Sequence, residues 1–302
     1  DQSFRDGSQE SIDSITGSLN EMMKSQDKHQ GQIWDELKDM NIELADSFAR
    51  QFDFDVDKWR GEKEALDEAR RAKVDKAEEA RKDALAINSE ALKYLARACN
   101  DVYAVLIHLS TDYVYDSINN RPLIETDPLE PKSVYAKSKK IGEDNLIAIA
   151  NRWIIIRTSW IYSQFGQNFV KTMLKLGRRN DVLKVVDDQI GTPTYAKDLA
   201  EVIIHMIDLI RSQNEGSPLV NNVYNFSNSG HTTWDAFARK IFDLSGIKCK
   251  VKGVNTTSFG ANAARPLWSV LSKEKIQSTM DIKIRHWESA LKECLETLVI
   301  NN

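Results

Sequence analysis

A tyrosine and a lysine stand four residues apart in the stretch SVYAKSKK, at Tyr135 and Lys139. Residues with this spacing lie on the same face of a helix. An ammonium group one turn away favours the phenolate of a tyrosine and lowers its pKa, which makes proton transfer near neutral pH easier. A lysine-rich surface helix would contain the same pair by chance. The spacing alone therefore leaves both interpretations open.

The segments on either side of the pair favour the chemical interpretation. AVLIHLS (104–110) and RWIIIRTSWIY (152–162) are short apolar runs rich in β-branched residues, as in strands that are buried on both faces of a parallel sheet. A helix from Tyr135 to Ala150 between them would complete a strand–helix–strand unit. Ligands bind at the carboxyl ends of such strands, and the stretch STD (110–112) lies at one of these ends.

A hydroxyl, a tyrosine and a lysine therefore converge at one edge of the predicted sheet, and such a set can reduce a carbonyl group. Hydride addition turns the carbonyl oxygen into an alkoxide, which needs a proton. Tyr135 can supply that proton, and the Thr111 hydroxyl can hold the oxygen. Lys139 can also reach the ribose hydroxyls of a nucleotide cofactor.

Composition and charge limit the classes of protein. The 302 residues suffice for two domains, and 41% hydrophobic with 28% charged residues indicate a globular protein. The net charge of −4 offers no basic surface for nucleic acid, and no run approaches the ~20 apolar residues of a membrane span. The three cysteines have neither disulfide nor zinc spacing, and the start DQSFRDGSQE is unlike a signal peptide. We expect a cytoplasmic protein without a bound metal.

The first hundred residues differ from the remainder. Residues 1–100 carry 23 acidic and 16 basic residues, and all six prolines follow residue 121. Apolar residues recur every three or four positions from Ile12 to Phe48, and 60–83 is mostly charged, so helices are expected here. The apolar stripe also offers a surface for helix-mediated self-association. Beyond these, the sequence predicts amphipathic helices at 196–210, 232–246 and 284–298 and a strand at 222–228.

A series of ordered motifs resembles a known family, the dTDP-4-dehydrorhamnose reductases, which are extended short-chain dehydrogenases/reductases. The motifs are VDKAEEA…LAINSEALKYLARACN, LIHLSTDYVYD, PKSVYAKSKKIGE, IIIRTSWIYSQFGQNFVKTML, VVDDQIGTPTYAKDLA, VYNFSNSG and ARPLWSVLSKEKI. The resemblance implies an α/β fold with a remnant of a Rossmann-like parallel sheet and a smaller substrate part, mostly 160–195 and 223–302. We therefore expect a helical segment at 1–73, unrelated to the family, and a reductase-like body at 74–302.

The resemblance also implies an activity and its catalytic residues. The implied reaction is the NADPH-dependent reduction of dTDP-4-dehydro-β-L-rhamnose to dTDP-L-rhamnose. Thr111, Tyr135 and Lys139 would be the catalytic residues. Asn88, Tyr135 and Lys139 would contact the cofactor, NADPH or NADH.

A second set of residues is implied by the resemblance to bind the dTDP-sugar. These are Asp112 and Tyr113 beside the sugar nucleotide, Trp160 near the thymine, Asn168 and Phe169 along the pocket, and Arg265 at the diphosphate. A guanidinium suits phosphate oxygens. Core packing of Trp160 and Phe169, and a surface ion pair for Arg265, remain alternatives.

The sequence departs from the family at its start. The family begins with a strand, a glycine-rich turn and a helix N-terminus that bind the cofactor pyrophosphate. Here Gly7, Gly17, Gly31 and Gly61 are isolated, and none follows a strand-like run. The strand at 104–110 would then be a sheet edge unless the first helices cover it. Two alternatives stay open: a cofactor-deficient chain whose helices form an interaction module, and a sugar-nucleotide epimerase, since epimerases share the tyrosine–lysine pair.

Overall fold

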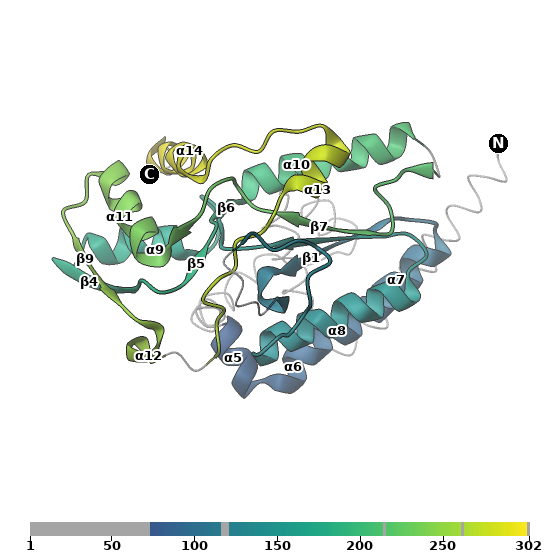
Figure 1. The fold of residues 1–302 in the computed structure, drawn as a ribbon, viewed down its shortest axis with the longest axis horizontal. Coiled ribbons are helices and arrows are strands. Elements are labelled where there is room, and N and C mark those ends of the chain that lie inside the picture. Colours follow the sequence, from purple (N-terminus) through teal and green to yellow (C-terminus); the bar gives the residue numbers. More distant parts are fainter. Residues whose placement is uncertain (1–72, 116–120, 214–215, 261–262, 301–302) are drawn as a thin grey trace, which may run out of the picture.

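The computed structural model describes residues 73–115, 121–213, 216–260 and 263–300. The helices expected before residue 73 lie outside the described residues. The rest of the chain forms two parts (Figure 1): a parallel sheet between two layers of helices, and a lobe of short strands and helices beside it. The expected α/β fold with a Rossmann-like sheet is confirmed.

The described elements match the sequence predictions closely. The strands predicted at 104–110 and 222–228 are present, as are the helices predicted at 135–150, 196–210, 232–246 and 284–298, whereas the run 152–162 forms two strands instead of one. In chain order the elements are α5 (Lys73–Glu79), α6 (Arg81–Leu85), the π-helical η1 (Ala86–Glu90), α7 (Ala91–Asp101), β1 (Leu106–Thr111), the 3-10 helical η2 (Asp112–Val114), α8 (Val134–Ile149), β2 (Trp153–Thr158), β3 (Ile161–Tyr162), α9 (Phe169–Gly177), β4 (Val182–Val186), β5 (Ile190–Gly191), β6 (Thr194–Tyr195), α10 (Ala196–Ser212), β7 (Asn222–Phe226), β8 (Thr232–Thr233), α11 (Trp234–Ser245), β9 (Lys250–Val254), α12 (Thr256–Phe259), α13 (Glu274–Met280) and α14 (Trp287–Ile300).

The main sheet has the order β1-β2-β7, and both pairs of strands are parallel. The register of β1 on β2 runs from Leu106 opposite Trp153 to Thr111 opposite Thr158, so the carboxyl ends of these two strands are level. Within the described part of the chain, β1 has no strand on its other side. It is an edge strand of the sheet that the described residues form.

Both faces of this sheet are buried, which explains the consecutive apolar residues Ile154 to Ile156 in its central strand β2. Ile154 and Ile156 of β2 pack with residues of α10 and α13 on one face. Ile155 points to the opposite face and packs with Ala96 of α7 and Leu146 of α8. Alternate side chains of a strand point to opposite faces, so a strand covered on both faces has no polar side.

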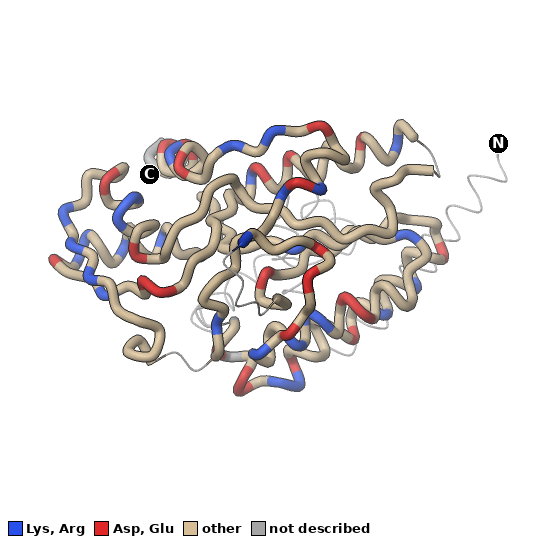
Figure 2. Tube along the Cα trace, viewed as in Figure 1, with Lys and Arg blue, Asp and Glu red and all other residues tan. Residues whose placement is uncertain are grey.

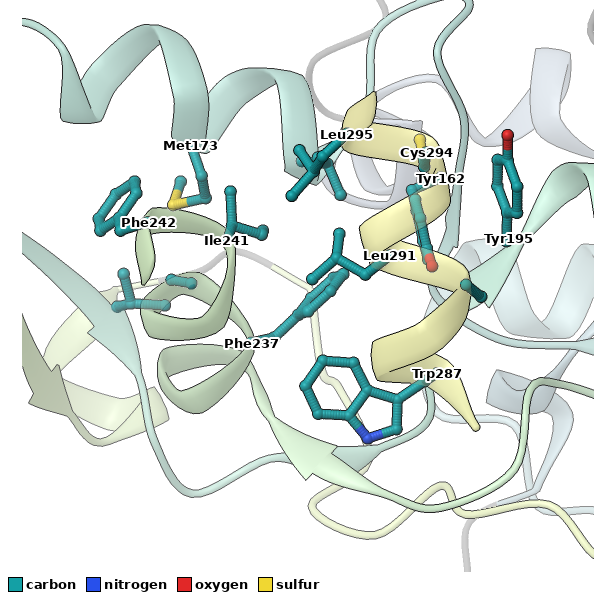
Figure 3. Packing of buried hydrophobic residues seen from close by; sticks show 14 of the residues in the cluster. Tyr162, Met173, Tyr195, Phe237, Ile241, Phe242, Trp287, Leu291, Cys294 and Leu295 are labelled. Carbon is teal, nitrogen blue, oxygen red and sulfur yellow. The ribbon is translucent and has the colours of Figure 1, made fainter. Parts of the chain in front are cut away.

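The second lobe has a core of its own, which Figure 3 shows from close by. It is made of aromatic and aliphatic side chains from α9, α11, α14 and the short strands, including Tyr162, Phe237 and Leu291. Phe237 meets Trp287 edge-on with ring centroids 5.6 Å apart. None of these buried residues belongs to the two cores of the main sheet. The lobe is therefore packed as a separate unit.

Charged residues follow the outer helices, whereas the strands of the main sheet carry few of them (Figure 2). Arg157 of β2 is an exception, because it is buried and pairs with a carboxylate of α8. None of the helices in the described ranges is both long and apolar enough to span a membrane.

Candidate active site

The carboxyl end of β1 carries a buried cluster of polar groups. The Thr111 hydroxyl donates to Oδ1 of Asp112 over 3.1 Å and accepts the N–H of Tyr113 over 3.3 Å, which caps η2. Burial raises the pKa of the Asp112 carboxyl to about 7, and the hydroxyls of Ser269 and Thr111 offset this only in part. Oδ2 of Asp112 and Oγ of Ser110 have no hydrogen-bond partner among the described residues.

Helix α8 brings Tyr135 and Lys139 to the same place, since it packs against both β1 and η2. The ring of Tyr135 meets that of Tyr113 edge-on, with centroids 6.2 Å apart. Nζ of Lys139 donates to the carbonyl oxygen of Leu109 over 2.7 Å and lies 3.5 Å from Nε2 of His108. The structure therefore gathers the tyrosine, the lysine and the Thr111 hydroxyl at one strand end.

The position of α8 is set by three further contacts. Ser133 caps the helix, because its hydroxyl accepts the N–H of Ala136 over 3.1 Å. Glu143, two turns after Tyr135, accepts two hydrogen bonds of 3.0 and 2.7 Å from Arg157 of β2. On the outer side, a Cβ atom at Gly142 would overlap the carbonyl oxygen of Asn88, so only glycine lets η1 come this close.

Asn88 of η1 lies beside the same turn of α8. Its amide nitrogen donates to Oγ of Ser138 over 3.0 Å, and that hydroxyl donates to the carbonyl oxygen of Tyr135 over 2.8 Å. Asn88, Tyr135 and Lys139 thus come from two facing elements, η1 and α8, and their assignment to the cofactor stays a prediction.

Arg265 forms an ion pair with Asp75 of α5. Nη2 lies 2.6 Å from Oδ2 and Nη1 lies 3.2 Å from Oδ1, and the N–H of Ala263 also donates to Oδ1 over 2.8 Å. Burial raises the pKa of the Tyr113 hydroxyl, and the Arg265 charge offsets this in part. The alternative interpretation of Arg265 as an ion pair is therefore correct for this structure, although the pair is half-buried at the margin of the site and not on the open surface.

Trp160, Phe169 and Asn168 lie in the second lobe. Trp160 stacks on Trp234 with ring centroids 3.5 Å apart, and Phe169 is tilted against the same ring at 4.6 Å. Asn168 caps α9, since its side-chain oxygen accepts the N–H of Lys171 over 3.1 Å. Its side-chain nitrogen also donates to the carbonyl oxygens of Ser163 and Phe165 over 2.7 and 3.2 Å, so all three side chains have structural contacts within the lobe.

One connection links this lobe to the strand end. A Cβ atom on Gly191 of β5 would lie 2.7 Å from the ring of Trp160 and 2.8 Å from the hydroxyl of Ser269, so any side chain there would overlap both. Ser269 in turn lies beside the Asp112 carboxyl. Only Gly191 and Ser269 therefore lie between the Trp160 ring and the polar cluster at the end of β1.

The chain is similar over most of its length to proteins of known family. The sequence model of one protein family, the RmlD substrate binding domain, matches residues 65–300. A crystal structure of a dTDP-4-dehydrorhamnose reductase from Clostridium acetobutylicum has 38% sequence identity and a TM-score of 0.70, covering 76% of this chain and 78% of that one. The chain belongs to the dTDP-4-dehydrorhamnose reductase family.

Two further relatives agree with this membership. The spore coat polysaccharide biosynthesis protein SpsK of Bacillus subtilis is 41% identical over 223 residues, which are 74% of this chain and 75% of SpsK. The dTDP-4-dehydrorhamnose reductase of Bacillus anthracis, solved in complex with NADP, has 36% identity and a TM-score of 0.70, covering 74% of this chain and 77% of that one.

The cofactor of the reductase family can be compared with the described residues. The hydroxyl of Tyr135, the ammonium of Lys139 and the amide of Asn88 are donors and acceptors suited to the ribose and carboxamide of a nicotinamide nucleoside. In the described ranges, Gly166 lies in the turn between β3 and the N-terminus of α9, but it is a single glycine and not the glycine-rich turn after a strand of the main sheet that binds pyrophosphate. These residues fit the nicotinamide end of NADPH, and the phosphate end has no counterpart among them. The same ranges contain no group of three His, Cys, Asp or Glu side chains able to hold a metal ion.

Sequence reasoning about the reductase site missed His108, Asp75 and Trp234. His108 had a signal, since a histidine inside an apolar strand is unusual; burial and then the Lys139 charge hold its pKa well below the usual value. Asp75 and Trp234 had none, because each acquires its partner, Arg265 or Trp160, only through folding.

Proposed function

We propose that this chain reduces dTDP-4-dehydro-β-L-rhamnose to dTDP-L-rhamnose with NADPH or NADH, in the cytoplasm, for the synthesis of cell-surface polysaccharide. Membership of the reductase family supports the reaction. The observation that carries the proposal is the meeting of Thr111, Tyr135 and Lys139 at the carboxyl end of β1.

In this proposal each catalytic residue has a separate task. The bound cofactor supplies the hydride. Tyr135 donates its hydroxyl proton to the carbonyl oxygen of the sugar as negative charge develops there, and later recovers a proton from solvent. The Thr111 hydroxyl turns from Asp112 to donate to the same oxygen. Lys139, held by the Leu109 carbonyl at 2.7 Å, keeps a positive charge near Tyr135 and reaches the cofactor ribose, as does Asn88.

The binding of the dTDP-sugar and the domain boundary belong to the same proposal. We assign residues 74–302 to the reductase body and 1–73 to a separate segment. The substrate lies against the part formed mostly by 160–195 and 223–302. The residues assigned to it are Asp112, Tyr113, Trp160, Asn168, Phe169 and Arg265. Trp160 would keep one ring face on Trp234, at 3.5 Å between centroids, and offer the other to the thymine.

Replacement of the proton donor tests the reaction. Tyr135→Phe removes only the hydroxyl, and loss of a general acid lowers turnover about 10²- to 10⁴-fold. Oxidation of NADPH in the presence of the dTDP-sugar measures this loss, and circular dichroism checks the fold. Tyr94→Phe on α7 is the matched control, because Tyr94 is exposed and lies outside the site. Equal rates for the two variants would contradict the assignment of Tyr135.

The second candidate function is that of a cofactor-deficient chain whose helices form an interaction module. It rests on the isolated glycines of the first hundred residues, which do not form a glycine-rich turn. Loss of several charge-assisted hydrogen bonds, at ~1.5–3 kcal/mol each, would weaken cofactor binding by about three orders of magnitude. A cofactor-deficient protein would then bind dTDP but bind NADPH no more tightly than about 1 mM. Titration of NADPH followed by its fluorescence separates the two functions, because micromolar binding would exclude the cofactor-deficient one.

A further inference from the structure

We propose that Asp75 is an internal substitute for the substrate diphosphate, so that α5 acts as an autoinhibitory latch on the site. The inference rests on the proposed function, in which Arg265 binds the diphosphate of the dTDP-sugar. On this view the nucleotide must displace Asp75 from Arg265 before it binds fully.

The surroundings of Asp75 are those of a bound anion. Its two carboxylate oxygens lie on Nη1 and Nη2 of Arg265, and one of them also accepts the backbone N–H of Ala263. A guanidinium fork combined with a backbone N–H group is the donor set that proteins offer to phosphate oxygens. Here a carboxylate from a segment 190 residues away in the sequence uses that set.

Arg265 cannot bind a diphosphate in the same way while this contact lasts. Nη1 also donates to the carbonyl oxygen of Ala263 over 3.1 Å. Both terminal nitrogens of the fork are therefore engaged. A diphosphate beside Asp75 would moreover face a like charge at close range, which is unfavourable. Exchange of one anion for the other avoids both difficulties.

The pair is built in a way that permits exchange. The side chains of Arg265 and Asp75 keep 20% and 24% of their exposure, so water reaches both. Contact with water weakens an ion pair relative to one that is fully buried. Asp75 stands in the first turn of a helix of seven residues, which is a short element to move.

Helix α5, the proposed latch, also contacts α8, the helix that carries Tyr135. The backbone N–H of Val134, the first residue of α8, donates to Oε1 of Glu78 over 2.7 Å. Release of α5 by the diphosphate would remove this carboxylate from the start of α8. Binding of the nucleotide to Arg265 would thus change the hydrogen bonding of Val134, the residue before Tyr135.

Calorimetric titration of the full chain with dTDP tests the latch. Asp75→Asn keeps the shape of the side chain and the acceptor for Ala263 but removes the competing charge. We expect dTDP to bind about tenfold more tightly to this variant, which corresponds to ~1.4 kcal/mol. Thymidine, which lacks the diphosphate, should bind equally to both proteins. Asp144→Asn is the charge-matched control, since Asp144 pairs with Lys140 on the exposed side of α8.

The outcomes separate the latch from the proposed function. Unchanged or weaker dTDP binding to Asp75→Asn, with clear binding to the parent chain, overturns the latch and leaves the reductase site standing. Absence of dTDP binding to both proteins overturns the latch together with the substrate site.

A measurement on the parent chain covers the case in which the variant does not fold. Hydrogen exchange of the α5 amides should become faster when dTDP is added, because the helix is released. Slower or unchanged exchange would overturn the latch.

Discussion

Two arginine–carboxylate pairs hold the helices of this reductase against its core, and they differ in almost every respect. Arg157 and Glu143 lie between β2 and α8 with side chains only 4% and 1% exposed. Arg157 also donates to the Tyr115 hydroxyl over 2.7 Å, and that hydroxyl donates to Asn225 over 3.0 Å. The pair of Arg265 and Asp75 is partly open to water and lies at the margin of the site.

The difference separates a structural part of the molecule from a functional part. A buried charge is tolerated only when it is paired and hydrogen-bonded, and the network around Arg157 meets this condition. The end of β1 does not, because Ser110 and Asp112 each keep a buried oxygen without a partner among the described residues. Such polar groups lower stability, and they lie at the strand end where the reaction is proposed. Stability is lower where ligands are to bind.

The largest effect is expected from breaking the buried pair. Glu143→Ala leaves the Arg157 guanidinium buried without a counter-charge, which should lower the free energy of unfolding by ~3–5 kcal/mol. Urea denaturation measures it. Asp144→Asn, one residue further on, breaks the solvent-exposed pair with Lys140 and should cost no more than ~0.5 kcal/mol. Similar losses in the two variants would show that burial does not distinguish the two kinds of pair.

A pH-dependent effect is expected at the strand end. The pKa of Asp112 in the folded protein, about 7, is above the ordinary value of 3.8. The contribution of this carboxyl to the free energy of unfolding is therefore most favourable below pH 3.8, and it is lost as the pH rises to 7. Asn does not titrate. The stability of Asp112→Asn relative to the parent should therefore increase by roughly 2–3 kcal/mol between pH 5 and pH 8.

Asp127→Asn is the control for this pH dependence. Its hydrogen bond with Arg121 lowers the pKa of the Asp127 carboxyl, so the parent carboxylate is charged throughout this pH range. The effect of Asp127→Asn should thus be constant between pH 5 and pH 8. Thermal unfolding at the two pH values measures both variants, and a constant effect for Asp112→Asn would contradict the raised pKa.

The smallest expected effect compares two buried serines. Oγ of Ser110 has no partner among the described residues, so Ser110→Ala should raise stability by ~0.5–1 kcal/mol. Ser138 is also buried, but its hydroxyl accepts from Asn88 and donates to the Tyr135 carbonyl. Ser138→Ala should lower stability by ~1 kcal/mol. Chemical denaturation of both variants gives the two signs, and a loss of stability in Ser110→Ala would reveal a partner for its hydroxyl.

Much of the fold could be predicted because local patterns carry it. The apolar, β-branched runs at 104–110 and 152–162 can only be covered on both faces, which predicts parallel strands with helices on either side. The four-residue spacing of Tyr135 and Lys139 places them on one helix face, and the strand–helix–strand order then brings them to Thr111. These steps use neighbours in sequence and simple periodicities.

The sequence by itself thus determined the sheet, its helices and the meeting of Thr111, Tyr135 and Lys139, since periodicity and chain order encode them. Only the tertiary structure decided what these and other side chains touch. Arg265 meets Asp75 across 190 residues, Trp160 meets Trp234, and Arg157 finds Glu143 through the packing of α8 on β2. No local pattern specifies such partners, because contact across a fold depends on how closely whole elements pack. The contact of Gly142 with Asn88 is one example, because it sets the distance between α8 and η1.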